Sequence, residues 1–407
     1  MTGTPLADQT VRFAIEGYGW LPNLRRRTGG DVVRTRLLGG PAVGMCGPAA
    51  ARFFYDEEHI RRHGALPEPI QGTLFGKGAV HGLDGVAHQR RKELFTGLMT
   101  PEGVERFGAL VADAWDAAVP GWRERGEVTL FDEAAVVICV AVCRWAGVPV
   151  ADAEVGPVTA DLVALVDGFG TVGPRHWRAR RARGRLEERF GDLVESVRRG
   201  EVTVRPGSAT AAVAAHRDAD GRQLDRHVAA VELLNVLRPT VTVAWFMMFA
   251  GHALHRWPEH RAALADGDGG FATAYAHELR RFYPFAPFIG GRAARDLTFD
   301  REPIPAGAVV LLDVYGQNHD PGLWPDPYAF RPDRFVDREI GQFDLIPQGG
   351  GDPRTGHRCP GEAITMAVLT ALVPRLARLD HRVPEQDLTI PLHRIPTRVH
   401  SGVRLAL

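Results

Sequence analysis

The chain has 407 residues, enough for a large buried core, with 49 Lys plus Arg against 49 Asp plus Glu and a formal net charge of zero. A balanced charge excludes the electrostatic footprint of a nucleic-acid-binding protein or of one that docks on an acidic membrane surface, so a small-molecule partner is expected. No Ser/Gly-rich or charge-rich linker divides the sequence, and we therefore expect a single domain over residues 1–407.

The N-terminus and the cysteines indicate the cellular compartment. The first residues, MTGTPLADQTVRF, lack the basic and apolar regions of a signal peptide. The most apolar long stretches, 134–150 and 240–254, are shorter than the roughly 20 residues that span a bilayer. Four cysteines in so long a chain do not make a disulfide framework. We expect a reduced, cytoplasmic protein without a membrane span.

Helical patterning dominates the predicted secondary structure. Short strand-like runs lie within residues 31–55, and strand signals return at 286–313 and near the C-terminus. Apolar residues recur at helical spacing over 86–98, 103–118, 130–147, 153–169, 176–199, 224–257 and 271–283. Pro, Gly and Asp predict an irregular meander over 322–351, and a last helix is expected from Pro360 to about Leu379. The sequence thus predicts a mainly α protein with a minor β-sheet.

The long helix expected over 224–257 carries a charge in an apolar face. Arg238 lies within VELLNVLRPTVTVAWFMMFAG (231–251) and precedes Pro239, which should kink the helix. A guanidinium cannot lose its proton, so its burial without an anion is costly. The nearest acid upstream, Glu232, is six residues away and falls on a different face of an ideal helix. We therefore expect the missing anion to be the substrate.

The segment QGGGDPRTGHRCPGEAITMAVLTAL (348–372) is the most informative in the chain. Its Gly-rich loop ends at Cys359, and Pro360 stands where the first turn of a helix should begin. Free backbone N–H groups and the helix dipole stabilise a thiolate there, so Cys359 is expected to be a metal ligand. The alternatives are a buried structural cysteine and a zinc site, but no CxxC or Cys/His pair accompanies it. Cys139 and Cys143, one helical turn apart, are expected in the core.

Three motifs together resemble the cytochrome P450 superfamily over nearly the whole chain. GHRCPGE (356–362) resembles its haem-binding loop, in which a thiolate pushes electron density onto the iron. Glu278 and Arg281 form a Glu-x-x-Arg on one helix face, and FRPDRF (330–335) supplies Arg334. The resemblance implies a P450 fold with haem b bound by Cys359. It also implies that Glu278, Arg281 and Arg334 form a buried structural network.

The long helix narrows the resemblance to one branch. Monooxygenases of the superfamily carry an acid–alcohol pair there, whereas Arg238-Pro239 is similar to the bacterial fatty-acid peroxygenases and alkene-forming decarboxylases. This implies that Arg238, with Pro239 beside it, binds the carboxylate of a long-chain fatty acid, which serves as acid–base for hydrogen peroxide. Oxidation at the α and β carbons without a redox partner follows from that resemblance.

Further site residues are implied by the same branch. TLFGKGAVHGLDGVAHQRRKELF (73–95) places Phe75 and His81 at its haem pocket, and a histidine at position 81 is typical of alkene-forming relatives, so terminal alkenes are expected among the products. The implied propionate ligands are His88, Lys92, Arg292 and His357, and the implied acyl-pocket residues are Val166, Phe169, Phe285 and Phe288. A backbone-bonded histidine, a solvated basic face and ordinary aromatic core are the respective alternatives.

Two other functions fit the sequence. The first is a conventional monooxygenase that uses a ferredoxin and a reductase, with Thr240 as the alcohol. The second is a haem-based sensor or carrier, which would show a ligand-induced spectral shift but form no product. For Arg238, a haem propionate or a distant Asp is the alternative to a substrate carboxylate.

Overall fold

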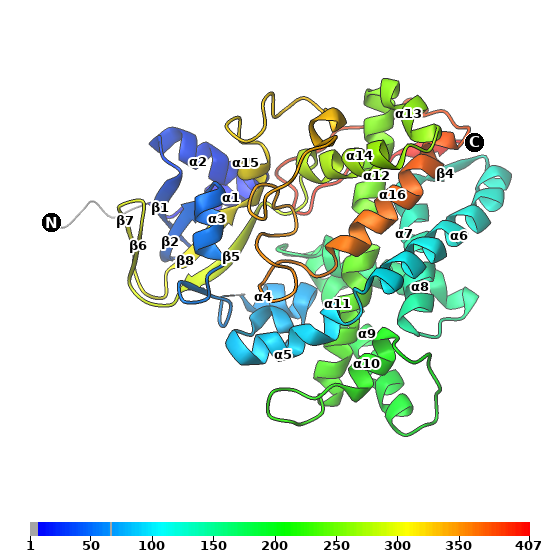
Figure 1. Cartoon of the computed structure of the whole chain (residues 1–407), viewed down its shortest axis with the longest axis horizontal. Helices are drawn as coiled ribbons and strands as arrows, with labels where there is room; N and C mark the ends of the chain where they lie inside the picture. The colour runs from blue at the N-terminus through cyan, green and yellow to red at the C-terminus, as the bar shows by residue number, and fades with distance from the viewer. Residues whose placement is uncertain (1–6, 66) are drawn as a thin grey trace.

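Strands from both halves of the chain form one small sheet beside a large body of helices (Figure 1). The computed structural model describes residues 7–65 and 67–407. Residues 1–6, on which part of the argument against a signal peptide rests, lie outside the described residues. The mainly α architecture with minor β structure that the sequence predicts is confirmed.

The helices follow one another along most of the chain. They are α1 (Thr10–Glu16), α2 (Trp20–Thr28), α3 (Pro48–Phe54), α4 (Glu68–Ile70), α5 (Gly85–Thr96), α6 (Pro101–Arg125), α7 (Leu130–Ala146), α8 (Asp152–Asp167), α9 (Pro174–Arg198), α10 (Ala209–Ala215), α11 (Arg226–Val241), α12 (Ala244–Arg256), α13 (Arg261–Ala265), α14 (Gly269–Phe282), α15 (Val314–Asn318) and α16 (Glu362–Arg378). Short helical turns lie between them: η1 (Gly17–Gly19), η2 (Gln71–Phe75), η3 (Val80–Gly82), η4 (Pro258–His260) and η5 (Pro332–Phe335).

The main sheet has the strand order β1-β2-β8-β5-β3. The strands are β1 (Val32–Leu37), β2 (Gly40–Met45), β3 (Ile60–Arg61), β4 (Glu127–Thr129), β5 (Phe288–Ala293), β6 (Leu297–Phe299), β7 (Glu302–Ile304), β8 (Val309–Asp313) and β9 (Arg404–Ala406). β2 and β8 run parallel, with Ala42 opposite Val309, whereas the other pairs are antiparallel. β1 and β2 from the predicted segment 31–55 and β5 and β8 from 286–313 therefore belong to one sheet, whereas β6 pairs with β7 and β4 with β9 in separate two-stranded sheets.

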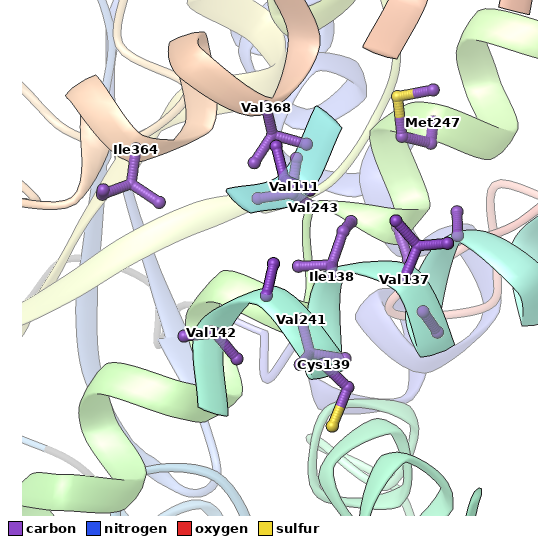
Figure 2. Packing of buried hydrophobic residues seen from close by; sticks show 14 of the residues in the cluster. Val111, Val137, Ile138, Cys139, Val142, Val241, Val243, Met247, Ile364 and Val368 are labelled. Carbon is purple, nitrogen blue, oxygen red and sulfur yellow. The ribbon is translucent and has the colours of Figure 1, made fainter. Parts of the chain in front are cut away.

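The largest core lies where α7 packs against α6, α11 and α12, with α16 packed against α6 and α12 (Figure 2). Val111 of α6, Ile138 of α7 and Val368 of α16 are fully buried there. Such branched apolar side chains recur at helical spacing because each helix turns one face inward. Cys139 and Cys143 are buried in the same cluster with free thiols, which confirms their predicted place in the core.

The long apolar segment over the centre of the protein is two helices, and the prediction of one helix kinked at Pro239 is wrong in this respect. α11 continues past the proline and ends at Val241, and α12 begins at Ala244. The Thr242 hydroxyl donates to the Arg238 carbonyl (2.8 Å), and tighter i, i+3 bonds follow, so the helical ladder breaks about one turn after Pro239. Arg226–Arg256 is long and apolar enough to cross a membrane, but 94% of its apolar window is buried inside the protein, as in a core helix.

Candidate active site

Cys359 lies in the loop that leads into α16. Its backbone N–H donates to the carbonyl of Gln348 (3.1 Å), and the Gln348 side-chain Nε2 lies 3.8 Å from the Cys359 sulfur. α16 begins at Glu362 rather than at Pro360 as predicted, because Pro360 and Gly361 form a turn whose Gly361 N–H faces the sulfur. Burial raises the pKa of the Cys359 thiol, and the hydrogen bonds from Gly361 and Gln348 lower it less than burial raises it. A bound metal ion is therefore what would hold this sulfur as a thiolate.

A second layer of side chains fixes the loop behind the sulfur. Arg280 is fully buried, donates through Nε to Gln348 Oε1 (3.1 Å) and pairs with Glu362 at the start of α16. Arg358 donates to the other oxygen of Glu362 (2.7 Å). Because Arg280 takes the oxygen of the Gln348 amide, the amide nitrogen is left to face Cys359 and the Thr365 hydroxyl (3.1 Å). The sequence did not single out Arg280 or Gln348, because their contacts join segments far apart in the chain.

The three charges of the predicted structural network are in contact. Arg281 of α14 forms a bidentate ion pair with Glu278, with both N···O distances at 2.7 Å. Arg334 of η5 places Nε 3.3 Å from the same carboxylate, and Glu278 and Arg281 are fully buried. Arg281 also donates to the carbonyls of Asn318 (2.9 Å) and Pro327 (2.8 Å), so this network ties α14 to the meander.

Most of the proposed propionate ligands gather beside the Cys359 loop. The His88 and His357 rings stack with centroids 3.8 Å apart, and Glu57 lies 3.1 Å from His357 Nε2. Burial lowers the pKa of His88 to about 4, so its ring is neutral at neutral pH. Lys92 donates to the carbonyls of Gly356 and Arg358 (2.8 Å for Arg358), and burial lowers its pKa to about 8.

Arg292 differs from the other three. It is exposed and donates to the carbonyls of Gly64 (2.7 Å) and Gly307 (2.9 Å), so its hydrogen bonds hold loops beside the sheet. Arg62 is instead the buried guanidinium near His357, stacked on Phe54 with 4.2 Å between its Cζ and the ring centroid. Arg62 directly follows β3, and only the fold decides that its side chain is buried while that of Arg61 is exposed.

The donor set of this region fits a haem. Two buried nitrogens of this region, His81 Nδ1 and Arg238 Nε, have no hydrogen-bond partner among residues 7–65 and 67–407, whereas His88 Nδ1 and His357 Nε2 face Glu57 at 3.6 Å and 3.1 Å. Buried polar groups are rarely left unpaired, so they indicate a polar or anionic ligand in this region. Arg238, His357, His88 and Lys92 all lower the pKa of His81, and Arg238 also senses Cys359, so these groups surround one buried region. A haem would be held here through the Cys359 sulfur, and Lys92, His88 and His357 are the groups that would face its propionates.

Arg238, Phe75 and His81 lie close together although they come from three elements. Arg238 of α11 is buried, with its Cζ 5.5 Å from the centroid of the Phe75 ring at the end of η2. The His81 ring, on η3, lies 4.3 Å from that of Phe75. Burial and the neighbouring Arg238 hold the pKa of His81 well below its usual range, so the imidazole is neutral. Pro239 follows Arg238 within α11.

Arg238 has no ion-pair partner within the part of the chain that the structure describes, but it does have a link to an acid. Its Nη2 donates to Asn235 Oδ1 (2.9 Å), and Asn235 Nδ2 donates to Glu232 Oε2 (3.0 Å). Burial lowers the pKa of Arg238 to about 9, whereas Cys359 and Glu232 raise it. The sequence placed Glu232 on a different helix face from Arg238, but the two side chains are linked through Asn235. The spacing of 232, 235 and 238, each three residues apart, was the available signal.

The predicted acyl-pocket residues do not share one environment. Val166 is buried at the end of α8, and Phe169 lies half-buried just after it. Phe285 packs against Phe246 at a centroid distance of 5.5 Å. Phe288 packs against Phe13 (5.2 Å) and Trp20 (6.1 Å) in the cluster that joins the N-terminal helices to the sheet. These contacts favour a structural role for the Phe288 ring.

Comparison with known proteins gives a consistent relationship. The chain matches the family model for cytochrome P450 over residues 271–395, which include the charge network and Cys359. Cytochrome P450SP alpha (CYP152B1), solved in complex with (R)-ibuprophen, is 41% identical over 98% of both chains with a TM-score of 0.96. Cytochrome P450EX alpha (CYP152N1), solved with myristic acid, is 36% identical over 100% of this chain and 99% of that one, with a TM-score of 0.94. Ligand-free cytochrome P450 OleT is 35% identical over 99% and 97%, with a TM-score of 0.96.

Curated relatives are more distant in sequence. Cytochrome P450 BJ-4 of Bradyrhizobium diazoefficiens is 26% identical over 342 residues, which cover 78% of this chain and 74% of the relative. Cytochrome P450 4A7 of Oryctolagus cuniculus is 27% identical over 176 residues, which cover 38% of this chain and 34% of the relative. The chain thus matches only about a third of the length of the latter relative.

Proposed function

The chain belongs to the cytochrome P450 family, and we propose that it is a haem b enzyme that oxidises long-chain fatty acids with hydrogen peroxide. The reaction is hydroxylation at the α or β carbon, oxidative decarboxylation to a terminal alkene, or both. A relative that is 36% identical over essentially the whole chain was solved with myristic acid, which supports a fatty acid as substrate.

The single observation that carries this proposal is the buried Arg238. Its guanidinium has one hydrogen bond to a neutral amide, no ion pair among the described residues, and a buried Nε without a partner. A buried cation without a counter-ion is costly, so an anion that binds it is strongly favoured. A carboxylate matches the planar donors of the guanidinium. Arg238 lies beside His81 and within electrostatic reach of Cys359, so a bound carboxylate would be held close to the haem.

The residues of the chain have separate tasks in this proposal. When bound through Cys359, the haem supplies the oxidising chemistry of peroxide. The carboxylate that Arg238 holds takes a proton from hydrogen peroxide and returns it to the departing oxygen, which leaves as water. Fixing the carboxylate limits oxidation to the adjacent carbons. In hydroxylation, fatty acid and peroxide give hydroxy acid and water; in decarboxylation, they give alkene, carbon dioxide and two waters.

His81 is proposed to act in the decarboxylation branch. Because its ring is neutral and Nδ1 has no partner within the described residues, it can donate or accept one hydrogen bond beside the substrate carboxylate. Phe75 packs between His81 and Arg238 and closes the apolar side of this carboxylate site.

The two rival functions have less support. The Thr240 hydroxyl, which a conventional monooxygenase would use, donates to the Val236 carbonyl (2.8 Å). A haem-based sensor or carrier forms no product, so Arg238 would lie beside the haem without a catalytic role. We propose that the enzyme works in the cytoplasm, needs no redox partner and has no membrane span.

The test is turnover by the purified, haem-loaded protein. Myristic acid and hydrogen peroxide are added without any reductase, and products are identified by gas chromatography and mass spectrometry. Hydroxy acids or the one-carbon-shorter terminal alkene support the proposal. Turnover only with NAD(P)H, ferredoxin and reductase would establish the monooxygenase, and binding without product under both conditions would establish the sensor. Arg238→Ala should lose this peroxide-driven turnover. Arg181→Ala removes an exposed arginine of α9 instead and is the matched control, with turnover unchanged.

A further inference from the structure

Three polar side chains lie in a row on the otherwise apolar α11. Glu232, Asn235 and Arg238 are all buried, and their side chains are joined by hydrogen bonds of 3.0 Å and 2.9 Å. Buried polar groups on an apolar helix cost stability unless they are hydrogen-bonded, and a fully bonded row holds its members in one arrangement. The row ends at the guanidinium to which the fatty-acid carboxylate is assigned.

The chemistry of the three groups fixes the direction of the central amide. A carboxylate only accepts hydrogen bonds and a guanidinium only donates them. Asn235 must therefore turn its NH₂ group to Glu232 and its oxygen to Arg238, and no other orientation satisfies both neighbours. The oxygen of Asn235 holds Nη2 of Arg238, which leaves other N–H groups of the guanidinium for a ligand.

Glu232 is itself held by donors on its other oxygen. Oε1 accepts from the backbone N–H of Val80 (2.8 Å) and from Arg91 Nη1 (2.6 Å), and Arg91 also donates to Asp218 (2.7 Å). Burial raises the pKa of Glu232, whereas Arg91, Asn235 and the Val80 N–H lower it. Because all three of these groups donate to the two carboxyl oxygens, the hydrogen bonds are best satisfied without a proton. Val80 directly precedes His81, so one carboxylate touches the segment that carries His81 and, through Asn235, the side chain of Arg238.

We infer that Glu232 is a positioning residue for the carboxylate site: its charge orients the Asn235 amide, and the amide in turn presents Arg238 to the fatty acid. This inference rests on the proposed function of Arg238. It assigns Glu232 to substrate binding through Asn235, the side chain that links it to Arg238.

The two carboxyl oxygens of Glu232 have different partners, so one substitution can disturb one of them and keep the other. In Glu232→Gln, the side-chain oxygen can still accept from Val80 and Arg91, but the new NH₂ group faces Asn235. The Asn235 amide must then turn its oxygen toward this new NH₂ group and its own NH₂ group toward Arg238, where two donors oppose each other. The guanidinium loses its anchor, while the segment before His81 keeps its own.

The experiment compares three variants of the haem-loaded enzyme with the parent. Myristic acid binding is measured by the fatty-acid-induced shift of the ferric haem spectrum and by calorimetry, and the alkene-to-hydroxy-acid ratio is measured with peroxide. Glu232→Gln and Asn235→Leu are expected to raise Kd for myristic acid about tenfold or more. The product ratio of Glu232→Gln should remain that of the parent. Asp218→Asn removes the other carboxylate of Arg91 and is the control, with Kd unchanged.

The outcomes are distinct. An unchanged Kd in a folded Glu232→Gln, an unchanged Kd in Asn235→Leu, or an equal rise in Asp218→Asn overturns the positioning role. Asn235→Leu removes no charge, so it keeps the test valid if Glu232→Gln does not fold. If the parent binds myristic acid but forms no product with peroxide, the proposed function fails, whereas the Kd comparison still decides the positioning role.

Discussion

Replacing Arg238 by Met should stabilise the substrate-free enzyme and abolish its tight binding of fatty acids. Burial lowers the pKa of Arg238 from 12.5 to about 9. That difference corresponds to a folding penalty of at most about 5 kcal/mol for the charged side chain, present at every pH below about 9. Removing the charge relieves the penalty but leaves the Asn235 oxygen without its donor, which costs about 1–3 kcal/mol.

The net gain in the free energy of unfolding is therefore at most about 2–4 kcal/mol, or a rise in Tm of a few degrees for a chain of this length. Breaking a buried ion pair costs about 3–5 kcal/mol, so Kd for myristic acid should rise at least about a hundredfold. Thermal unfolding of the haem-loaded protein, with and without myristic acid, measures both effects. Myristic acid should raise the Tm of the parent but not that of Arg238→Met.

The reasoning is refuted if Arg238→Met is less stable than the parent in the absence of fatty acid. The guanidinium would then already have a resident anion, such as a haem propionate, and the anion would not be the substrate. Arg238→Lys gives the matched control, because it keeps the charge but loses the planar donors.

Three further outcomes are expected. His81→Gln should abolish alkene formation and keep hydroxylation, as measured by the product ratio in gas chromatography; an unchanged ratio would contradict the assigned role. Burial lowers the pKa of His252 and of His319 to about 4, so both are neutral in the fold while their unfolded forms take up protons below the ordinary pKa of about 6.5. Stability should therefore be intact above pH 6.5 and fall progressively as the pH drops toward 4, which urea unfolding at stepped pH would show; a flat profile over that range would disprove it. Glu278→Gln should leave Arg281 as an uncompensated buried cation, lower the free energy of unfolding by about 3–5 kcal/mol and reduce haem incorporation; normal haem content and stability would exclude the structural role.

The parts of the site that the sequence predicts best are those with a local chemical signature. Cys359 follows a Gly-rich loop and precedes a helix, and Glu278 and Arg281 are one helical turn apart. Arg238 stands out because a charge interrupts an apolar helix. Each of these signals lies within a few residues of chain, and each corresponds to a distinct environment in the structure.

What the sequence does not predict depends on contacts between distant segments. The hydrogen bond from Lys92 to the Arg358 carbonyl joins residues 266 positions apart in the chain, and the burial of Arg62 after β3 is decided by the fold around it. At the break after Val241, the Thr242 N–H and hydroxyl both donate to the Arg238 carbonyl and i, i+3 bonds replace the regular ladder, whereas propensity alone favours an unbroken helix there. The Phe288 side chain is apolar, as expected of a pocket residue, but it packs against the N-terminal aromatic residues Phe13 and Trp20.

The parallel pairing of β2 with β8 has a consequence for synthesis of the protein on the ribosome. Ala42 pairs with Val309, so the β1–β2 hairpin emerges long before the strand that completes the sheet. Until then, β2 has an unpaired edge, and the apolar side chains of Val43 and Met45, buried in the finished protein, have no cover. Contacts between such distant segments form slowly, and an uncovered strand edge can pair with another nascent chain. We therefore expect expression of this enzyme to depend on chaperones and on slow translation or low temperature more strongly than that of a helical protein without such a strand.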